Sequence, residues 1–306
     1  MRVWAYTLRP RSAFRLLPSA STLWGQLAWA IRELEGDAAL TDWLDAHHEA
    51  IASGKEPPLR LSSAFPKGFL PRPHLRPVLV EETTLRKRLK GVRWVSPELF
   101  ARMLEKGEEA LRSAVEAKEP SFLSESPFER APRTRVAMNR LTGAAAEGQL
   151  FEDHVYWPKT ELVVYAKLNA GVDPSYIAHL LSHVGQVGFG GGASIGLGAF
   201  DLAGPEETEL PAVGKGAKVL LGPALLPKEA KGYWRGEFYW GRLGHVYAHA
   251  PVPFKRPYLR VLEGATLPED APDALLDVTP PTPPASGVQI FENLAPLFLP
   301  APKGVI

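Results

Sequence analysis

The sequence of 306 residues contains no cysteine and only three methionines. The absence of cysteine excludes disulfides, thiol catalysis and a zinc site with cysteine ligands, and it agrees with an intracellular origin. No apolar run approaches the roughly 20 residues that a transmembrane helix needs. The first ten residues are too short and too polar for a signal peptide. We therefore expect a cytoplasmic protein with no membrane partner.

Histidine occurs eight times, but no pattern of histidines indicates a metal or catalytic site. His47 and His48 are adjacent, and adjacent residues on a helix diverge by about 100°, so both cannot face one site. His179 and His183 have the i, i+4 spacing of helical metal ligands, but Leu180 stands where an H-E-x-x-H motif has glutamate. We expect structural or surface roles for all four histidines, no metal and no cofactor.

The net charge of +1 conceals three clusters of basic residues. Residues 67–93, which include Lys67 and Arg72, hold eight Lys or Arg against two glutamates, a local charge of +6. The other two clusters are Arg9, Arg11 and Arg15, and Arg130, Arg133, Arg135 and Arg140. Clustered Lys and Arg supply phosphate contacts, so this distribution predicts a groove for a polyanion. A solvated surface helix is the alternative for residues 81–93.

Six of the 27 glycines lie in residues 188–200, which read GFGGGASIGLGAF. Pro174 and Ser175 are start signals for a helix before this stretch, and a strand is expected after it. A Rossmann fingerprint needs the order strand, loop, helix, and neither G-x-G-x-x-G nor a P-loop sequence is present. Consecutive glycines still allow another backbone to approach closely and can turn several N–H groups toward an anionic chain. The stretch therefore predicts a loop that binds an extended polyanion such as RNA, against the alternative of a tight turn only.

Within this loop, Phe189 is a candidate stacking face and Ser194 a candidate hydroxyl donor. The candidate backbone contacts of the loop are Gly188, Gly190, Gly191 and Gly192.

A helix is predicted over residues 19–36, with Ser21 or Thr22 as its N-cap. Its open N-terminus could also receive a phosphate, although capping alone is the stronger interpretation for either residue.

Arg135, Asn139 and Arg140 lie in a segment without acidic neighbours, before an expected hairpin. Arginine planes stack on splayed bases, and asparagine can bond a base edge or a 2′-hydroxyl, so these three residues are further candidates for RNA binding. The alternative is that the arginines bridge to carboxylates of the protein itself.

The order of expected elements predicts an α+β protein. A strand over residues 3–8 and the helix over 19–36 come first, followed by a second helix over 41–53. A strand then leads into a proline-punctuated segment over 59–77, and residues 85–123 have a mostly helical pattern. Two strands over 154–157 and 161–168, separated by a hairpin-like interval, precede the helix and the glycine loop.

This order is βαββαβ with insertions, the ferredoxin-like or RNA-recognition-motif topology. We expect one such RNA-binding domain with a helical insertion over residues 1–205, and a second, degenerate and β-rich ferredoxin-like domain over 206–306. The strands expected in the second half are 217–221, 236–239, 245–247, 258–262 and 288–291.

The glycine-rich stretch resembles the signature of the RAMP proteins of CRISPR systems. Four further segments resemble the fourth subunit of the type III-A Csm effector complex, and a fifth, residues 255–264, extends the resemblance into the second half. The four segments are STLWGQLAWA (21–30), SAFPKGFLPRP (63–73), RVAMNRLTG (135–143) and GQLF (148–151).

This resemblance implies a non-catalytic subunit that caps the 5′ repeat-derived handle of the CRISPR RNA in an antiviral ribonucleoprotein. It implies contacts with the large subunit, which has a polymerase-like palm, and with the first backbone ribonuclease subunit. Relatives often carry a charged residue within the loop, whereas Gly192, Leu197 and Ala199 occupy those positions here. Backbone N–H groups would therefore have to supply more of the contacts.

Two other functions compete with this interpretation. A repeat-processing endoribonuclease of the same superfamily would use His47 or His48 as general acid or base. Such relatives carry the glycine loop near the C-terminus, whereas about a hundred residues follow it here. A small-molecule enzyme with the loop around a cofactor phosphate is the third candidate, and the helix-first order argues against it.

Overall fold

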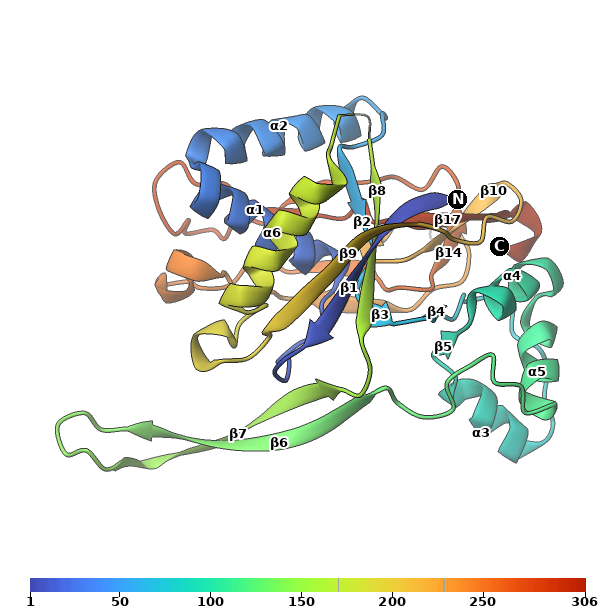
Figure 1. Cartoon of the computed structure of the whole chain (residues 1–306), viewed down its shortest axis with the longest axis horizontal. Helices are drawn as coiled ribbons and strands as arrows, with labels where there is room; N and C mark the ends of the chain where they lie inside the picture. The colour runs from blue at the N-terminus through green and yellow to red at the C-terminus, as the bar shows by residue number, and fades with distance from the viewer. Residues whose placement is uncertain (170, 228, 230) are drawn as a thin grey trace.

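The computed structural model describes residues 1–169, 171–227, 229 and 231–306. Figure 1 shows helices on one face of a central sheet and a separate group of three helices at one side of the molecule. A long two-stranded hairpin projects away from the sheet, and the strands of the C-terminal third lie next to the sheet.

The central sheet is antiparallel and has the strand order β2-β8-β1-β9, with β3 also paired to β8. Its strands are β1 (Arg2–Pro10), β2 (Leu59–Leu61), β3 (Phe65–Pro66), β8 (Leu162–Leu168) and β9 (Phe200–Glu209). Side chains alternate between the two faces of a strand. Tyr6 and its partner Val164 therefore face one core cluster, whereas Val3 and Tyr165 face another. Both faces of this sheet are thus buried.

Three helices cover the face that carries Tyr6, and the sequence predicted all three. They are α1 (Ala20–Glu35), α2 (Asp37–Ala52) and α6 (Pro174–Val187). Leu27 of α1 and Leu181 of α6 have no exposed surface and belong to the same core cluster as Tyr6. The start of α6 is capped by the Asp173 side chain, which accepts a hydrogen bond from the N–H of Ser175.

A small helical subdomain is inserted between β3 and β8, as the pattern over 85–123 predicted. It contains α3 (Thr83–Gly91), α4 (Pro97–Lys106), α5 (Glu108–Glu116) and the paired strands β4 (Leu70–Pro71) and β5 (Trp94–Val95). Ser96 caps α4 by accepting a hydrogen bond from the N–H of Leu99. Gly107 ends α4 at φ +72°, a conformation that glycine adopts without the usual steric cost.

The projecting hairpin consists of β6 (Phe128–Met138) and β7 (Ala145–Pro158), which pair with each other. The expected pairing of residues 154–157 with 161–168 is therefore wrong, because β7 pairs with β6 whereas β8 pairs with β1, β2 and β3. The short strand β2 occupies the place in the sheet that we expected for residues 154–157.

The C-terminal third contains three small antiparallel sheets. Their strands are β10 (Gly216–Leu220), β14 (Thr266–Pro268) and β17 (Phe298–Pro302); β11 (Ala224–Leu225), β12 (Gly236–Tyr239) and β13 (Tyr258–Val261); β15 (Leu275–Asp277) and β16 (Phe291–Asn293). Three short 3-10 turns, η1 (Ala193–Ile195), η2 (His245–His249) and η3 (Lys303–Val305), complete the described elements. Residues 245–247 thus form a turn instead of the expected strand, and the strand expected over 288–291 begins only at Phe291.

One hydrophobic core cluster joins the first two hundred residues to the C-terminal third. Val3 and Val163 of the central sheet belong to the same cluster as Val219 of β10 and Leu299 of β17. Backbone hydrogen bonds also cross this junction, because the N–H of Ser63 donates to Leu221 at 2.8 Å. Within the described residues, we find no helix whose length and hydrophobicity would allow it to span a bilayer.

Candidate nucleic-acid interface

The glycine loop between α6 and β9 is fixed at both ends by backbone hydrogen bonds. Gly188 ends α6 at φ +101°, and its N–H donates to Val184. The N–H of Phe189 donates to the carbonyl of Gly198 at 2.9 Å, and that of Gly198 donates to Ala13 at 2.8 Å. The loop is therefore a closed structure held against the segment that follows β1.

Within this closed loop, a stretch of backbone is left open. The N–H groups of Gly190, Gly191 and Ser194 make no hydrogen bond to the described part of the chain. A Cβ placed on Gly190 or Gly191 would meet no atom within 4 Å. Unpaired N–H groups on accessible backbone can bind an anion, so the geometry agrees with the predicted use of these two glycines. Gly192 differs, because a Cβ there would lie 2.7 Å from the Leu197 side chain.

The expected stacking role of Phe189 is wrong. Its ring is only 2% exposed and packs against Phe14, with the ring centroids 6.3 Å apart. A base cannot stack on a ring that the core covers, so the phenylalanine anchors the loop. Ser194 is exposed, as its predicted role as a hydroxyl donor requires.

The loop lies against the base of the projecting hairpin. Leu197 of the loop shares a small hydrophobic cluster with Ala13 and with Val155 of β7. Phe14 also forms an antiparallel bridge with Tyr156. The structure thus places the glycine loop at the base of the hairpin, whereas the candidates Asn139 and Arg140 lie at its tip. It also adds residues 12–14, which no sequence signal connected to the loop.

Arg135 and Arg140, the two candidate arginines of the hairpin, have different surroundings. Arg135 lies 3.7 Å from Asp153 and its guanidinium is 5.3 Å from the centre of the Phe151 ring. Arg140 is exposed in the turn at the tip. Asn139 is engaged locally, because its side-chain oxygen accepts a hydrogen bond from the N–H of Leu141 at 2.9 Å. The alternative of internal ion pairs therefore applies to Arg135.

Ser21 and Thr22 are not the N-cap of α1, because the helix begins at Ala20 and Ser19 is the N-cap. Ser21 is 3% exposed, and the Thr22 hydroxyl lies 3.0 Å from that of Ser19. The N–H of Ala20 donates to the Ser63 hydroxyl at 3.0 Å. The N–H of Ala20 is thus satisfied by the protein, and the buried Ser21 side chain is not available to a phosphate in solvent.

Lys67 and Arg72 are both engaged with carboxylates. Lys67 is exposed and pairs with Glu161 at 2.8 Å, as does Arg9. The hydrogen bonds from Lys67 and Arg9 lower the pKa of Glu161. Arg72 belongs to the helical subdomain and lies 2.6 Å from Glu108, so its side chain holds that subdomain together. In Figure 1 the glycine loop, which follows α6, lies apart from the helical subdomain to which Arg72 belongs.

His47, one of the two histidines that a nuclease would use, is not available as a general acid or base. His47 has no exposed surface, packs between the rings of Trp24 and Trp43, and contacts the Trp43 carbonyl through Nδ1 at 2.8 Å. Burial lowers the pKa of His47 to about 4. A neutral and inaccessible imidazole cannot exchange protons with RNA, whereas His48 is exposed. His183 contacts Glu33 through Nε2 at 2.9 Å.

Comparison with known proteins identifies the class to which this fold and loop belong. The family model of the RAMP superfamily matches residues 19–201 of the sequence, which is more than half of the chain. The chain therefore belongs to the RAMP superfamily.

Individual relatives define the position within that superfamily. The chain is 28% identical over 245 residues to the CRISPR system Cms protein Csm4 of Thermococcus onnurineus (strain NA1), covering 76% of this chain and 77% of that protein. A chain of a Csm1-Csm4 cassette in complex with pppApA matches with a TM-score of 0.63 at 19% identity, covering 98% of both chains. A chain of a Csm3-Csm4 subcomplex in the type III-A CRISPR-Cas interference complex matches with a TM-score of 0.60 at 16% identity, covering 97% and 99%. Together these matches indicate a Csm4-like subunit of a type III-A Csm complex, as the sequence resemblance predicted.

Proposed function

We propose that this Csm4-like chain is a non-catalytic RNA-binding subunit that holds the 5′ repeat-derived handle of the CRISPR RNA. The observation that carries the proposal is the open backbone of the glycine loop. Gly190 and Gly191 present unpaired N–H groups beside the base of a hairpin that bears arginines. Such a surface suits the phosphate chain of single-stranded RNA.

We also propose that the chain docks the large subunit and a backbone subunit of the complex. The support is that similar chains occur in a Csm1-Csm4 cassette and in a Csm3-Csm4 subcomplex. We further propose that the first half of the chain is a ferredoxin-like domain. The chain order β1, α1, β2, β8, α6, β9 and the strand order β2-β8-β1-β9 are those of a ferredoxin-like domain. This order supports a ferredoxin-like first domain over 1–205, and we propose a degenerate second domain over 206–306.

Salt dependence tests the RNA-binding part of the proposal. Each phosphate neutralised on a single strand contributes roughly −0.7 to the slope of log affinity against log salt. A handle of several nucleotides should therefore give a slope steeper than about −2 for the purified protein. A flat response to salt would contradict the proposal.

Two substitutions of Gly191 test the loop itself. The backbone of Gly191 does not have positive φ, and a Cβ there meets open space, so both Gly191→Ser and Gly191→Asp should fold like the parent. The aspartate adds a negative charge beside the phosphates, so it should weaken RNA binding more than the serine. RNA affinities and melting temperatures of both variants should be measured together. Equal RNA affinity in the parent and both variants would show that the loop is only a turn.

Incubation with a labelled repeat RNA distinguishes a nuclease from a subunit that binds RNA without cleaving it. We expect the RNA to be retained without cleavage. Cleavage that is lost in a His48→Ala variant would favour the nuclease, because His48 is the exposed member of the pair.

A further inference from the structure

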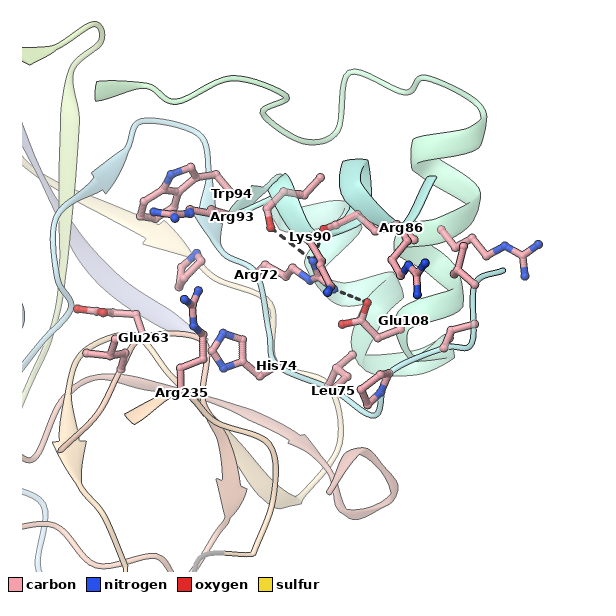
Figure 2. A pocket seen from close by; sticks show the side chains of 18 residues that line it. Arg72, His74, Leu75, Arg86, Lys90, Arg93, Trp94, Glu108, Arg235 and Glu263 are labelled. Carbon is pink, nitrogen blue, oxygen red and sulfur yellow. Dashed lines mark hydrogen bonds and ion pairs between the residues drawn. The ribbon is translucent and has the colours of Figure 1, made fainter. Parts of the chain in front are cut away.

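A cavity of about 530 Å³ lies between the helical subdomain and the C-terminal third, away from the glycine loop. Figure 2 shows its walls, with Arg93 and Trp94 on one side and Arg235, His74 and Glu263 facing them. A volume of this size is within the range of small-molecule sites, roughly 300–1,000 Å³.

The lining of this cavity has an excess of positive charge. Six of its side chains are arginine or lysine and two are glutamate. The ion pair of Glu108 with Arg72 at 2.6 Å uses one of those carboxylates. The other, Glu263, accepts a short hydrogen bond from the Ser63 hydroxyl.

Four of the cations have no carboxylate partner. Arg86, Lys90, Arg93 and Arg235 make no ion pair with any residue of the described ranges. Cations gathered around a hollow with so little compensation create a positive potential there, which attracts an anion. The lining of the cavity therefore keeps a net positive charge that an anion would neutralise.

His74 lines the cavity and lies in the same positive potential. Its Nδ1 is buried and has no hydrogen-bond partner among the described residues. Burial, together with the charges of Arg235 and Arg72, lowers the pKa of His74 to about 4. The ring is thus neutral near pH 7 and leaves one unsatisfied polar atom, which a ligand in the cavity could satisfy.

The remaining wall is apolar and aromatic. Val92 and Leu89 are buried there, and the half-buried Trp94 ring is held by Phe65 and Phe128, with centroids 5.7 and 6.2 Å away. A fixed indole beside arginines combines a surface for a planar base with partners for a phosphate. An inorganic anion has no planar group that could stack on the Trp94 ring.

We propose that this cavity is a second anion site, which binds a phosphorylated nucleotide with its phosphate on Arg93 and Arg235 and its base against Trp94. The nucleotide is either a free mononucleotide or one residue of a bound RNA strand. The proposal does not rest on the RNA-binding role of the glycine loop, because no residue of that loop lines the cavity.

The test uses the full chain and the double variant Arg93→Gln/Arg235→Gln. Both arginines are exposed and unpaired within the described part of the structure, so the variant should melt like the parent. Lys55→Gln is the matched control, because Lys55 is an exposed cation outside the cavity. ATP, AMP, inorganic phosphate and a short single-stranded RNA are each titrated by calorimetry.

A free nucleotide as the ligand would give saturable binding of ATP or AMP, weakened at least tenfold in the double variant and unchanged in Lys55→Gln. An RNA residue as the ligand would give no binding of mononucleotides and at least tenfold weaker RNA binding in the double variant. Binding of phosphate as tight as that of AMP would overturn the role given to Trp94. Unchanged affinities for every probe in the double variant would overturn the whole proposal, even if Gly191→Asp weakens RNA binding.

Discussion

Two glycines of the loop have nearly the same positive φ but different surroundings, and alanine at each should separate the two effects. Gly196 has φ +78° and Gly198 has φ +77°. A Cβ on Gly196 meets nothing within 4 Å, whereas a Cβ on Gly198 would lie 2.3 Å from the carbonyl oxygen and 2.5 Å from the nitrogen of Phe189. Both substitutions carry the conformational cost, and only one carries a steric cost.

The magnitudes follow from these contacts. A left-handed conformation costs a residue with a Cβ about 1–2 kcal/mol, which should be the whole effect of Gly196→Ala. In Gly198→Ala the Phe189 backbone must move as well, and its ring is buried. Strain of about 1–3 kcal/mol and loss of a hydrogen bond worth about 1 kcal/mol are then added. We expect Gly198→Ala to lose about 3–6 kcal/mol in total.

Urea unfolding followed by circular dichroism measures both free energies, with Gly191→Ala as a control that should stay within about 0.5 kcal/mol of the parent. Equal losses for Gly196→Ala and Gly198→Ala would refute the argument, because they would show that the loop relaxes freely around the added methyl group.

Three further predictions concern stability and RNA binding. Because the pKa of His47 is lowered to about 4, its contribution to stability is complete above about pH 6.5, and about 3 kcal/mol is lost as the pH falls toward 4. His47→Leu should flatten that part of the unfolding free energy against pH, and an unchanged slope would contradict it. Glu292 is buried and pairs with the partly buried Lys255 at 2.5 Å, so Lys255→Met, which leaves the Glu292 charge unpaired, should cost about 3–5 kcal/mol; adding Glu292→Leu should restore most of the melting temperature, and no recovery would argue against coupling. Arg140→Ala should cost ~1–3 kcal/mol of RNA affinity without a change in melting temperature, whereas Arg135→Ala should also lower the melting temperature; the reverse pattern in a binding titration would contradict the geometry.

The parts of the fold that depend on local sequence were predictable. The helices α1, α2 and α6 follow from apolar residues at helical spacing and from start or stop residues such as Pro174 and Gly36, all within one segment. Strand pairing is not local. The strand β6 carries one proline and three arginines instead of alternating apolar residues, so nothing in its own sequence indicated that it pairs with β7.

The candidate site was also predictable only where it depends on local sequence. The glycine loop was found because its composition is unusual, but the sequence could not distinguish its open glycines from its packed ones. Phe189 was misassigned because its partner, Phe14, lies 175 positions away in the chain. The cavity was also missed, since its walls combine the basic residues 86–93 with Arg235 from the other half of the chain.

The position of β1 in the centre of the sheet affects how the chain is made. β1 pairs with β8 and β9, so Leu8 lies opposite Leu162 and Leu202. At roughly 5–20 residues per second, the ribosome needs about 10–40 s between these partners. Tyr6 and Leu8, which end with no exposed surface, have neither neighbouring strand until β8 is made, and they lack β9 for the whole interval. The first strand synthesised is thus among the last to be completed, which makes its early exposure the point at which chaperones or premature aggregation would act.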